Sequence, residues 1–400
     1  MDLPQADRDA VVELTRTLVR APSPSGRERP AVDAFVSALH DLGFDRVELD
    51  EAGNAIGTLV GGDGPTLVLN GHLDTVPTGD PADWPVDPLG GELNDGAVWG
   101  RGSVDMKGAL AAMAVAARAV ARAGFAGRLV VAGMVQEEVG GFGARWFGER
   151  QRPDLVVLGE PSDLGIRIGH RGRIEARVVL PGRIAHAAKA ELGENAVLRA
   201  ARYSLALAGL TLPQDPLLGR SSATVTQVRS FPVDGANVVP GRAELTIDYR
   251  NVPGDEVDAV LARLAGVDLG ARVDLPEETA RSEDGRVERR FPRVNPAYLL
   301  DRGHPAVGWA RAVLGAALER EVGVGTWWFA TDAPHLAVRG APVLGFGPGD
   351  PELAHTTREA VPIASLHAAA HGYRALASAF LTGTPPWEGS MPSALAEARA

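Results

Sequence analysis

The sequence contains Thr66-Leu67-Val68-Leu69-Asn70-Gly71-His72-Leu73-Asp74, in which an apolar run of strand length is followed at once by a histidine and an aspartate. A short apolar run of this kind is typical of a strand that is buried on both faces. Three later apolar runs also precede His or carboxylate side chains: 128–135 precedes Glu137 and Glu138, 155–158 precedes Glu160, and 342–346 precedes His355. We therefore expect four strands that each carry polar groups at one end.

Segments with helical periodicity alternate with these runs. Apolar residues recur at helical spacing in three segments, residues 106–123 are rich in alanine, and two shorter runs favour strands; the segments are 8–21, 29–42 and 304–319, and the shorter runs are 46–49 and 56–60. This alternation predicts an α/β fold with an open mixed sheet flanked by helices. In open sheets of this class, ligands bind beyond the carboxyl ends of the strands, so the polar groups should meet in one site.

The pattern changes between residues 173 and 285. Longer alternating strands are expected there, with helices between them; the strands are 174–180, 224–228 and 243–249, and the helices are 194–209 and 255–265. We interpret this part as an inserted α+β sandwich domain, which divides the α/β domain into residues 1–172 and 286–400. Residues 77–99 are expected to form a loop, residues 279–297 a return linker, and residues 384–400 a frayed end.

Composition excludes several classes of function. The 400 residues carry a formal charge of -11 and only two lysines, Lys107 and Lys189, so a nucleic-acid partner is not expected. The N-terminus is acidic without a signal pattern, and the most apolar run, 109–117, is too short to cross a bilayer. We therefore expect a cytoplasmic protein with no membrane partner. Because there is no cysteine, any metal must be held by His and carboxylate side chains, which suit zinc, manganese or cobalt.

Five motifs together resemble those of the di-metal aminoacylase family of zinc metallopeptidases, which includes acetylornithine deacetylase, succinyl-diaminopimelate desuccinylase, carboxypeptidase G and several dipeptidases. The resemblance covers residues 8–383. The motifs are His72-x-Asp74-x-x-Pro77, Gly100-Arg101-Gly102-x-x-Asp105-Met106-Lys107-Gly108, Glu137-Glu138-x-Gly140, Gly159-Glu160-Pro161 and the late His355. The resemblance implies a zinc aminopeptidase-like catalytic domain that binds two divalent ions, with zinc as the default and cobalt or manganese as alternatives.

The resemblance also implies a role for each ligand. Asp105 would bridge both ions and precede a cis peptide bond. His72 and Glu160 would complete the first metal site, and Glu138 and His355 the second. Glu137 would be the general base that takes a proton from the bridging water and later delivers it to the leaving amine. Asp74 would hold the His72 imidazole in one tautomer.

In the inserted domain, the resemblance assigns His186 to an oxyanion-binding motif that acts across the two subunits of a homodimer. Asn237 and Arg250 would bind a substrate carboxylate, and Thr331 would belong to the pocket wall. From the residues alone, other interpretations stay open. Asp105 could cap a helix, Arg250 could form an inter-strand ion pair, and Asn237 could belong to a turn.

The predicted function is a metal-dependent hydrolase that cleaves the amide bond of an N-acyl amino acid, as deacetylases and desuccinylases do. A metallo-carboxypeptidase or dipeptidase with the same machinery is the alternative within this class, and its substrate would be a short peptide. An inert relative that only binds a ligand is the alternative from another class. Such a relative would be expected to have lost Glu137 or one of the five metal ligands, and all six residues are present.

Overall fold

The structure is a computed structural model that describes residues 3–382. A mixed sheet of nine strands forms the centre of the larger part of the molecule. Strand β3 runs parallel to β6 and β7, and β22 runs parallel to β7, whereas β1 and β2 are antiparallel additions at one edge. The order is β1 (Arg46–Leu49), β2 (Ala55–Val60), β6 (Arg128–Met134), β3 (Thr66–His72), β7 (Leu155–Leu158), β22 (Val343–Gly345), β8 (Ile166–His170) and β20 (Tyr298–Leu299), and β21 (Val324–Trp327) also pairs with β8. This arrangement confirms the predicted α/β class.

The register of the central strands brings their polar ends together. In β3, His72 lies opposite Met134 of β6, and Asn70 lies opposite Leu158 of β7. Because these three strands are parallel, the residues that follow them emerge at the same edge of the sheet.

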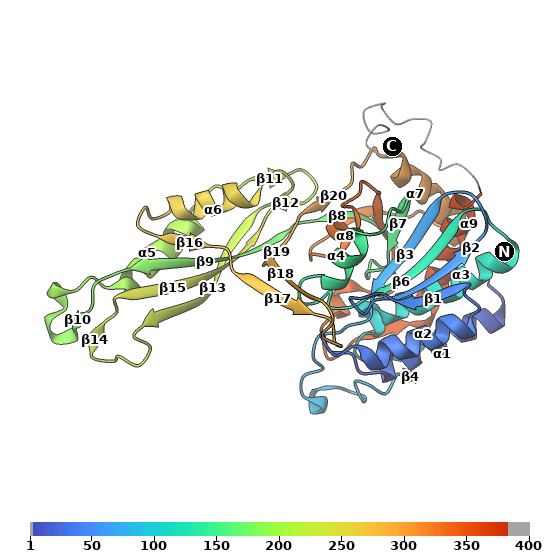
Figure 1. Cartoon of the computed structure of the whole chain (residues 1–400), viewed down its shortest axis with the longest axis horizontal. Helices are drawn as coiled ribbons and strands as arrows, with labels where there is room; N and C mark the ends of the chain where they lie inside the picture. Colours follow the sequence, from blue (N-terminus) through green and yellow to red (C-terminus); the bar gives the residue numbers. More distant parts are fainter. Residues whose placement is uncertain (1–2, 383–400) are drawn as a thin grey trace.

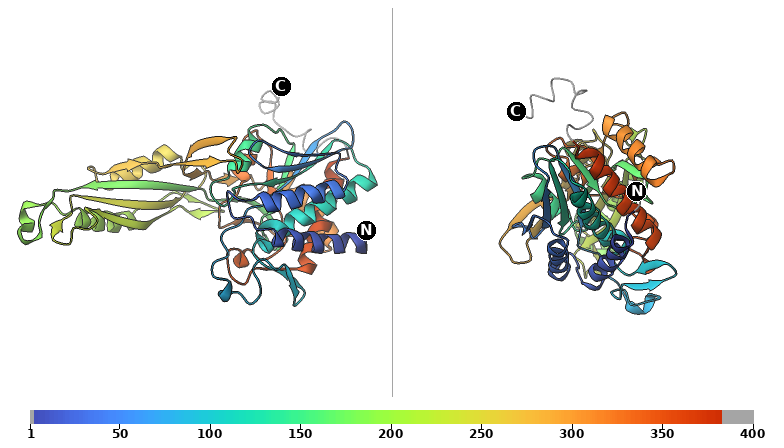
Figure 2. Two further views of the ribbon diagram at one scale, coloured as in Figure 1. Left: turned by 60° about the horizontal axis from the view of Figure 1, so that its bottom comes forward. Right: turned by 90° about the vertical axis from the view of Figure 1, so that its right-hand side faces the viewer.

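Alternate side chains of each central strand enter two different cores, which explains why the runs are apolar throughout. In β3, Leu67 and Leu69 face the larger core, while Val68 faces the smaller one. The larger core is covered by α1 (Gln5–Arg20), α2 (Arg29–Asp41), α3 (Gly108–Ala123), α7 (Pro305–Leu318) and α9 (Ile363–Phe380), and the smaller by α4 (Phe142–Gly148) and α8 (Ala333–Leu336). Figure 2 shows α1 and α2 side by side along the sheet.

A second, antiparallel sheet forms an arm that projects from this body (Figure 1). Its strands are β13 (Ser222–Phe231), β15 (Arg242–Arg250), β9 (Arg173–Pro181), β16 (Arg272–Asp274) and β19 (Val294–Asn295). Alternate residues of β9 and β15 pack against α5 (Ala196–Ala208) and α6 (Val257–Gly266). The short strands β10 (Ala185–His186) and β14 (Val238–Val239) pair at the far end of the arm. The domain boundaries at 173 and 285 remain predictions.

Two segments differ from the expectation of irregular chain. Within 77–99, β4 (Glu92–Asn94) and β5 (Ala97–Trp99) form a small sheet with β23 (Ala360–Pro362). Within the expected return linker, β17 (Glu277–Arg281) pairs with β18 (Glu288–Pro292) as a hairpin. Strands β4, β17 and β18 were missed because they are mostly exposed and carry few apolar residues, and β5 and β23 because each is only three residues long. Residues 384–400, expected to be frayed, lie outside the described part of the chain.

Candidate metal centre

His72 ends β3 with its ring fixed by the backbone. Its Nδ1 lies 2.9 Å from the carbonyl oxygen of Asp74, and its Nε2 lies 2.9 Å from Oδ1 of Asp105. A proton on Nδ1 donated to that carbonyl leaves the Nε2 lone pair free to bind a metal. The imidazole is buried, so this orientation is held by the surrounding core.

Asp105 presents its two carboxylate oxygens to two different histidines. Oδ1 faces His72, and Oδ2 lies 3.1 Å from Nε2 of His355. His355 Nε2 also lies 3.0 Å from Oε1 of Glu138. A carboxylate whose oxygens face separate donor sets has the arrangement needed to bridge two ions. The peptide bond between Asp105 and Met106 is cis, as the resemblance implied.

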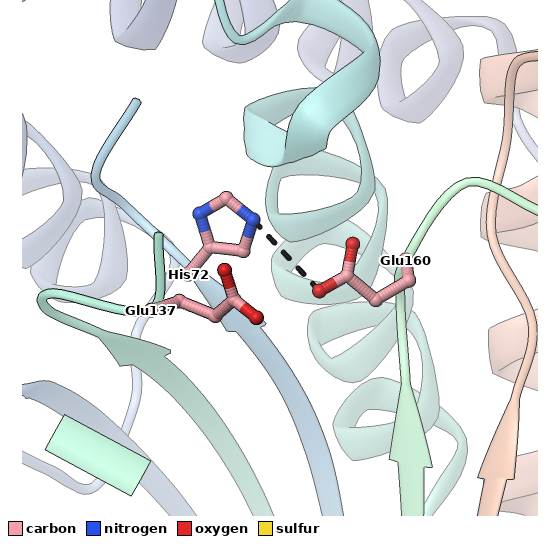
Figure 3. A group of neighbouring side chains, drawn as sticks. All are labelled: His72, Glu137 and Glu160. Carbon is pink, nitrogen blue, oxygen red and sulfur yellow. Dashed lines mark ion pairs between the residues drawn. The ribbon is translucent and has the colours of Figure 1, made fainter. Parts of the chain in front are cut away.

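Glu137 and Glu160 lie on the His72 side of this arrangement. Figure 3 shows the side chains of His72, Glu137 and Glu160 pointing toward one another from the ends of three neighbouring strands. Their ligand atoms lie within 4.8 Å of one another, as do those of His72, Asp105 and Glu138. His72 Nε2 is 3.8 Å from Oε1 of Glu160. The structure therefore brings together all five predicted ligands and Glu137.

The three glutamates of this cluster, Glu137, Glu138 and Glu160, are difficult to ionise without a nearby cation, whereas hydrogen bonds from His355 and His72, despite burial, keep the pKa of Asp105 below its usual value. Burial, with Asp332 nearby, raises the pKa of Glu137 well above its usual value. Burial and the charge of Asp105 do the same for the pKa of Glu160. Although burial lowers the pKa of His72, its contact with Asp105 raises that pKa well above normal. Hydrogen bonds to Asp105 and Glu138 raise the pKa of His355 to about 10.

These observations fit a pair of divalent ions. The donors are carboxylate oxygens and imidazole nitrogens, which bind zinc, manganese and cobalt. Like charges that are buried together destabilise one another, and cations in their midst remove that cost. Asp105, with one oxygen toward His72 and the other toward His355, is the residue placed to contact both ions.

The Asp74 carboxylate makes closer contacts with the loop that carries Glu137 and Glu138 than with the His72 ring. The His72 ring contacts the Asp74 carbonyl, while the Asp74 carboxylate is 3.6 Å from Nδ1. The carboxylate instead accepts the N–H groups of Glu137 at 3.0 Å and Glu138 at 3.1 Å, and the hydroxyl of Ser25 at 2.7 Å. The nearest partner of His72 Nδ1 in Asp74 is therefore the backbone carbonyl, and the carboxylate lies farther away.

The predicted substrate-binding residues lie in different places. Arg250 lines the cavity of about 430 Å³ that contains Asp105, Glu137 and Glu160. It also pairs with Asp248 at 2.6 Å on its own strand, rather than across strands. Thr331 is buried, and its Oγ1 accepts the N–H of Ala333, so its side chain serves its own loop.

His186 and Asn237 lie together at the far end of the arm, away from the metal ligands of the same chain (Figure 1). His186 is exposed in β10, opposite Val238. The Asn237 carbonyl accepts the N–H of Ala187. A single chain therefore does not bring His186 to its own cluster in this conformation.

Three buried charged residues near the cluster were not singled out from the sequence as parts of the site. Glu359 and Arg101 form a buried pair behind the Asp105 loop. Asp332 is buried beside Glu137, and burial raises its pKa to about 7. The Oδ1 atom of Asp332 has no hydrogen-bond partner within residues 3–382. Glu359 lies four residues after His355, and nothing beside it in the sequence marks it as part of the site.

Comparisons with known proteins find relatives over most of the chain. The chain is 32% identical over 377 residues to a [LysW]-lysine hydrolase from Deinococcus radiodurans, covering 90% of this chain and 94% of that protein. It is 30% identical over 380 residues to a succinyl-diaminopimelate desuccinylase from Gluconacetobacter diazotrophicus, covering 90% and 94%. Its fold is similar to that of the metallo-carboxypeptidase Sso-CP2 from Sulfolobus solfataricus, with a TM-score of 0.74 and 15% identity over 92% of this chain and 98% of that one.

A family model matches most of the chain as well. Residues 68–379, which contain every ligand of the cluster, match the model described as peptidase family M20/M25/M40. No helix within residues 3–382 is long and apolar enough to cross a membrane. From the extent of these matches, the chain belongs to peptidase family M20/M25/M40 and is an amidohydrolase or peptidase.

Proposed function

We propose that the protein removes the acyl group from an N-acyl amino acid with two divalent ions and Glu137 as the general base. The observation that carries this proposal is that Glu137 and Arg250 line the same cavity as the metal ligands. A cavity of about 430 Å³ suits a small molecule. The guanidinium of Arg250 on its wall matches the carboxylate that every N-acyl amino acid carries.

When bound, the two ions would polarise the amide carbonyl and lower the pKa of a water molecule between them. His72, Asp105 and Glu160 would hold one ion, and Asp105, Glu138 and His355 the other. Zinc is the first choice for these donors, and cobalt or manganese would fit them too.

Glu137 would move the proton. Its carboxylate projects toward His72 and Glu160 (Figure 3), and it would take a proton from the attacking water. It would then deliver that proton to the amide nitrogen, which leaves as an amine. The hydrogen bond from the Glu137 N–H to Asp74 fixes the loop during both transfers.

A peptidase acting on a dipeptide or as a carboxypeptidase is the second candidate. A further cavity of about 590 Å³ shares Glu137, Glu138 and Arg250 with the first and continues past Arg173 and Arg293. This added space would accept a substrate longer than an N-acetyl amino acid. The same catalytic groups would cleave either amide, so the shape and charge of the cavity decide between the two candidates.

We further propose a cytoplasmic homodimer in which His186 completes the site of the other subunit. Strand β13 lies at the edge of the arm sheet and exposes Val228, so its backbone groups are available for pairing with another strand. The exposed His186 at the end of the arm would then reach the partner's cavity and stabilise the developing oxyanion.

Turnover of a panel of substrates tests the proposed reaction. N-acetyl and N-succinyl amino acids and dipeptides are each incubated with protein loaded with zinc, cobalt or manganese, and the released amine is measured. Turnover of the N-acyl amino acids supports the deacylase. Cleavage of dipeptides alone would favour the peptidase, and no turnover of either class in protein that binds two ions would overturn both.

A further inference from the structure

A buried carboxylate lies directly behind the loop that carries Asp105. Glu359 is fully buried and immediately precedes β23. Its Oε1 atom accepts three backbone N–H groups of this loop, those of Gly102 at 2.9 Å, Val104 at 3.1 Å and Asp105 at 3.1 Å. One oxygen therefore fixes the backbone of the loop from Gly102 to Asp105, the residue proposed to bridge the two ions.

The other oxygen of Glu359 binds Arg101, which reaches two more loops. Arg101 Nη1 lies 2.5 Å from Oε2 of Glu359 and also donates to the carbonyl of Thr356 at 3.3 Å. Its Nη2 donates to the carbonyl of Pro77 at 3.4 Å. Thr356 follows His355, and Pro77 lies three residues after Asp74. The guanidinium is covered by the ring of Trp84, 5.0 Å from its centre.

We propose that the Arg101–Glu359 pair is a positioning device that sets how Asp105 and His355 face each other, and thereby the affinity of the centre for its second ion. The inference rests on the proposed metal-dependent function. The pair contacts the backbone of Asp105 and of Thr356, so it would act through these loops. Arg101 also neutralises a carboxylate that would otherwise repel the nearby Asp105.

The arm contains a matched ion pair that serves the fold alone. Asp255 is buried, accepts the hydroxyl of Tyr249 at 2.7 Å, and pairs with Arg263 at 3.0 Å. These partners all belong to β15, α6 and the segment between them, and none is a proposed metal ligand. Damage to this pair should lower stability without changing the metal centre, which separates a positioning role from general stabilisation.

Cobalt binding to the chelator-treated, full-length protein tests the proposal. Co²⁺ is titrated into wild type, Glu359→Ala, Glu359→Gln, Arg101→Lys, Asp105→Ala and the control Asp255→Asn. The number of bound ions, their Kd, the visible absorption of bound cobalt and the Tm of each metal-free variant are measured. Glutamine keeps an oxygen that can accept the N–H groups, and lysine keeps the charge of Arg101 but loses its second nitrogen.

We expect Glu359→Ala to weaken binding of the second cobalt ion by roughly 10- to 100-fold, as loss of an outer-shell partner does. Its cobalt spectrum should change, and Glu359→Gln should recover part of the affinity. Arg101→Lys should also lose affinity, whereas Asp255→Asn should lower only the Tm. If Glu359→Ala does not fold, Glu359→Gln and Arg101→Lys decide the outcome.

Wild-type affinity and spectrum in both Glu359→Gln and Arg101→Lys would overturn the positioning role. The proposed metal centre would still stand after that result, provided that Asp105→Ala no longer binds two cobalt ions. If Asp105→Ala also binds two cobalt ions, the centre itself has been placed wrongly, and the proposed function fails with it. The two failures are therefore distinguishable in one set of titrations.

Discussion

The Oδ1 atom of Asp74 accepts the backbone N–H of Glu137 at 3.0 Å, so a residue at the end of one strand holds the loop that follows the neighbouring strand. The other oxygen of Asp74 accepts the N–H of Glu138 at 3.1 Å. The proposed base and a proposed metal ligand are thereby fixed by a single carboxylate, which is fully buried.

The substitution Asp74→Asn should disturb this arrangement because an amide presents one oxygen and one NH₂ group. The NH₂ group cannot accept the second N–H and would face it instead. We expect kcat to fall roughly 10- to 100-fold, the range typical of outer-shell partners, with little change in KM. Steady-state kinetics measures the effect, and Ser25→Ala, which removes a hydroxyl donor to the same carboxylate, is the milder control. An unchanged kcat would contradict the role given to Asp74.

Glu137→Gln should abolish proton transfer while preserving the shape of the cavity. We expect kcat to fall by about 10²- to 10⁴-fold, because that is the usual contribution of a positioned general base. The variant should still bind two metal ions, which elemental analysis of the purified protein can count. A variant that hydrolyses substrate as fast as wild type would remove Glu137 from the mechanism.

Asp105→Ala should prevent binding of the two metal ions. Its two oxygens face His72 and His355 separately, so both metal sites lose a ligand at once. Equilibrium dialysis against zinc measures the number of bound ions, and His355→Ala serves as the comparison because His355 contacts only one side of the cluster. We expect His355→Ala to keep one ion more firmly than the other.

Stability of the metal-free protein should fall as the pH rises from acid to neutral. Burial, and then the charge of Asp105, raises the pKa of Glu138 and Glu160 above the ordinary value of 4.5. Above pH 4.5 the folded chain therefore binds more protons than the unfolded chain. The free energy of unfolding falls as rising pH forces these two glutamates to ionise in the folded state.

Zinc should reverse this trend because it binds the ionised carboxylates and displaces protons. The gain in Tm on adding zinc should therefore be larger at about pH 7.5 than at about pH 5. Calorimetry at both values measures the gain, and Asp105→Ala should show little gain at either. Equal gains in the wild-type protein would argue against zinc binding at these carboxylates.

The proposed role of His186 across subunits predicts complementation between inactive variants. His186→Ala and Glu137→Ala should each be nearly inactive, but a mixed dimer carries one site with both residues intact. Equal mixing with free exchange of subunits should restore about a quarter of wild-type activity, since half the dimers are mixed and each has one complete site. No recovery in dimers shown to have exchanged would place His186 outside the partner's site.

The sequence predicted the central strands well because each is apolar on both faces, as Leu67, Val68 and Leu69 illustrate. It also indicated the residues that the structure gathers into the cluster, since each comes shortly after such a strand or in a recognisable motif. It did not indicate Glu359, because the partners of this carboxylate are backbone N–H groups, which any residue type supplies. The β17–β18 hairpin was missed because its charged, exposed residues carry no hydrophobic alternation.

The long separation in sequence between Glu160 and the pair His355 and Glu359 has a consequence for synthesis. A nascent polypeptide that has emerged only as far as Glu160 already contains His72, Asp105, Glu137 and Glu138. It lacks His355 and also the carboxylate that gathers the Asp105 loop. The second of the two proposed metal sites would therefore be completed only when the polypeptide has emerged as far as Glu359, 199 residues beyond Glu160, and so well after the first.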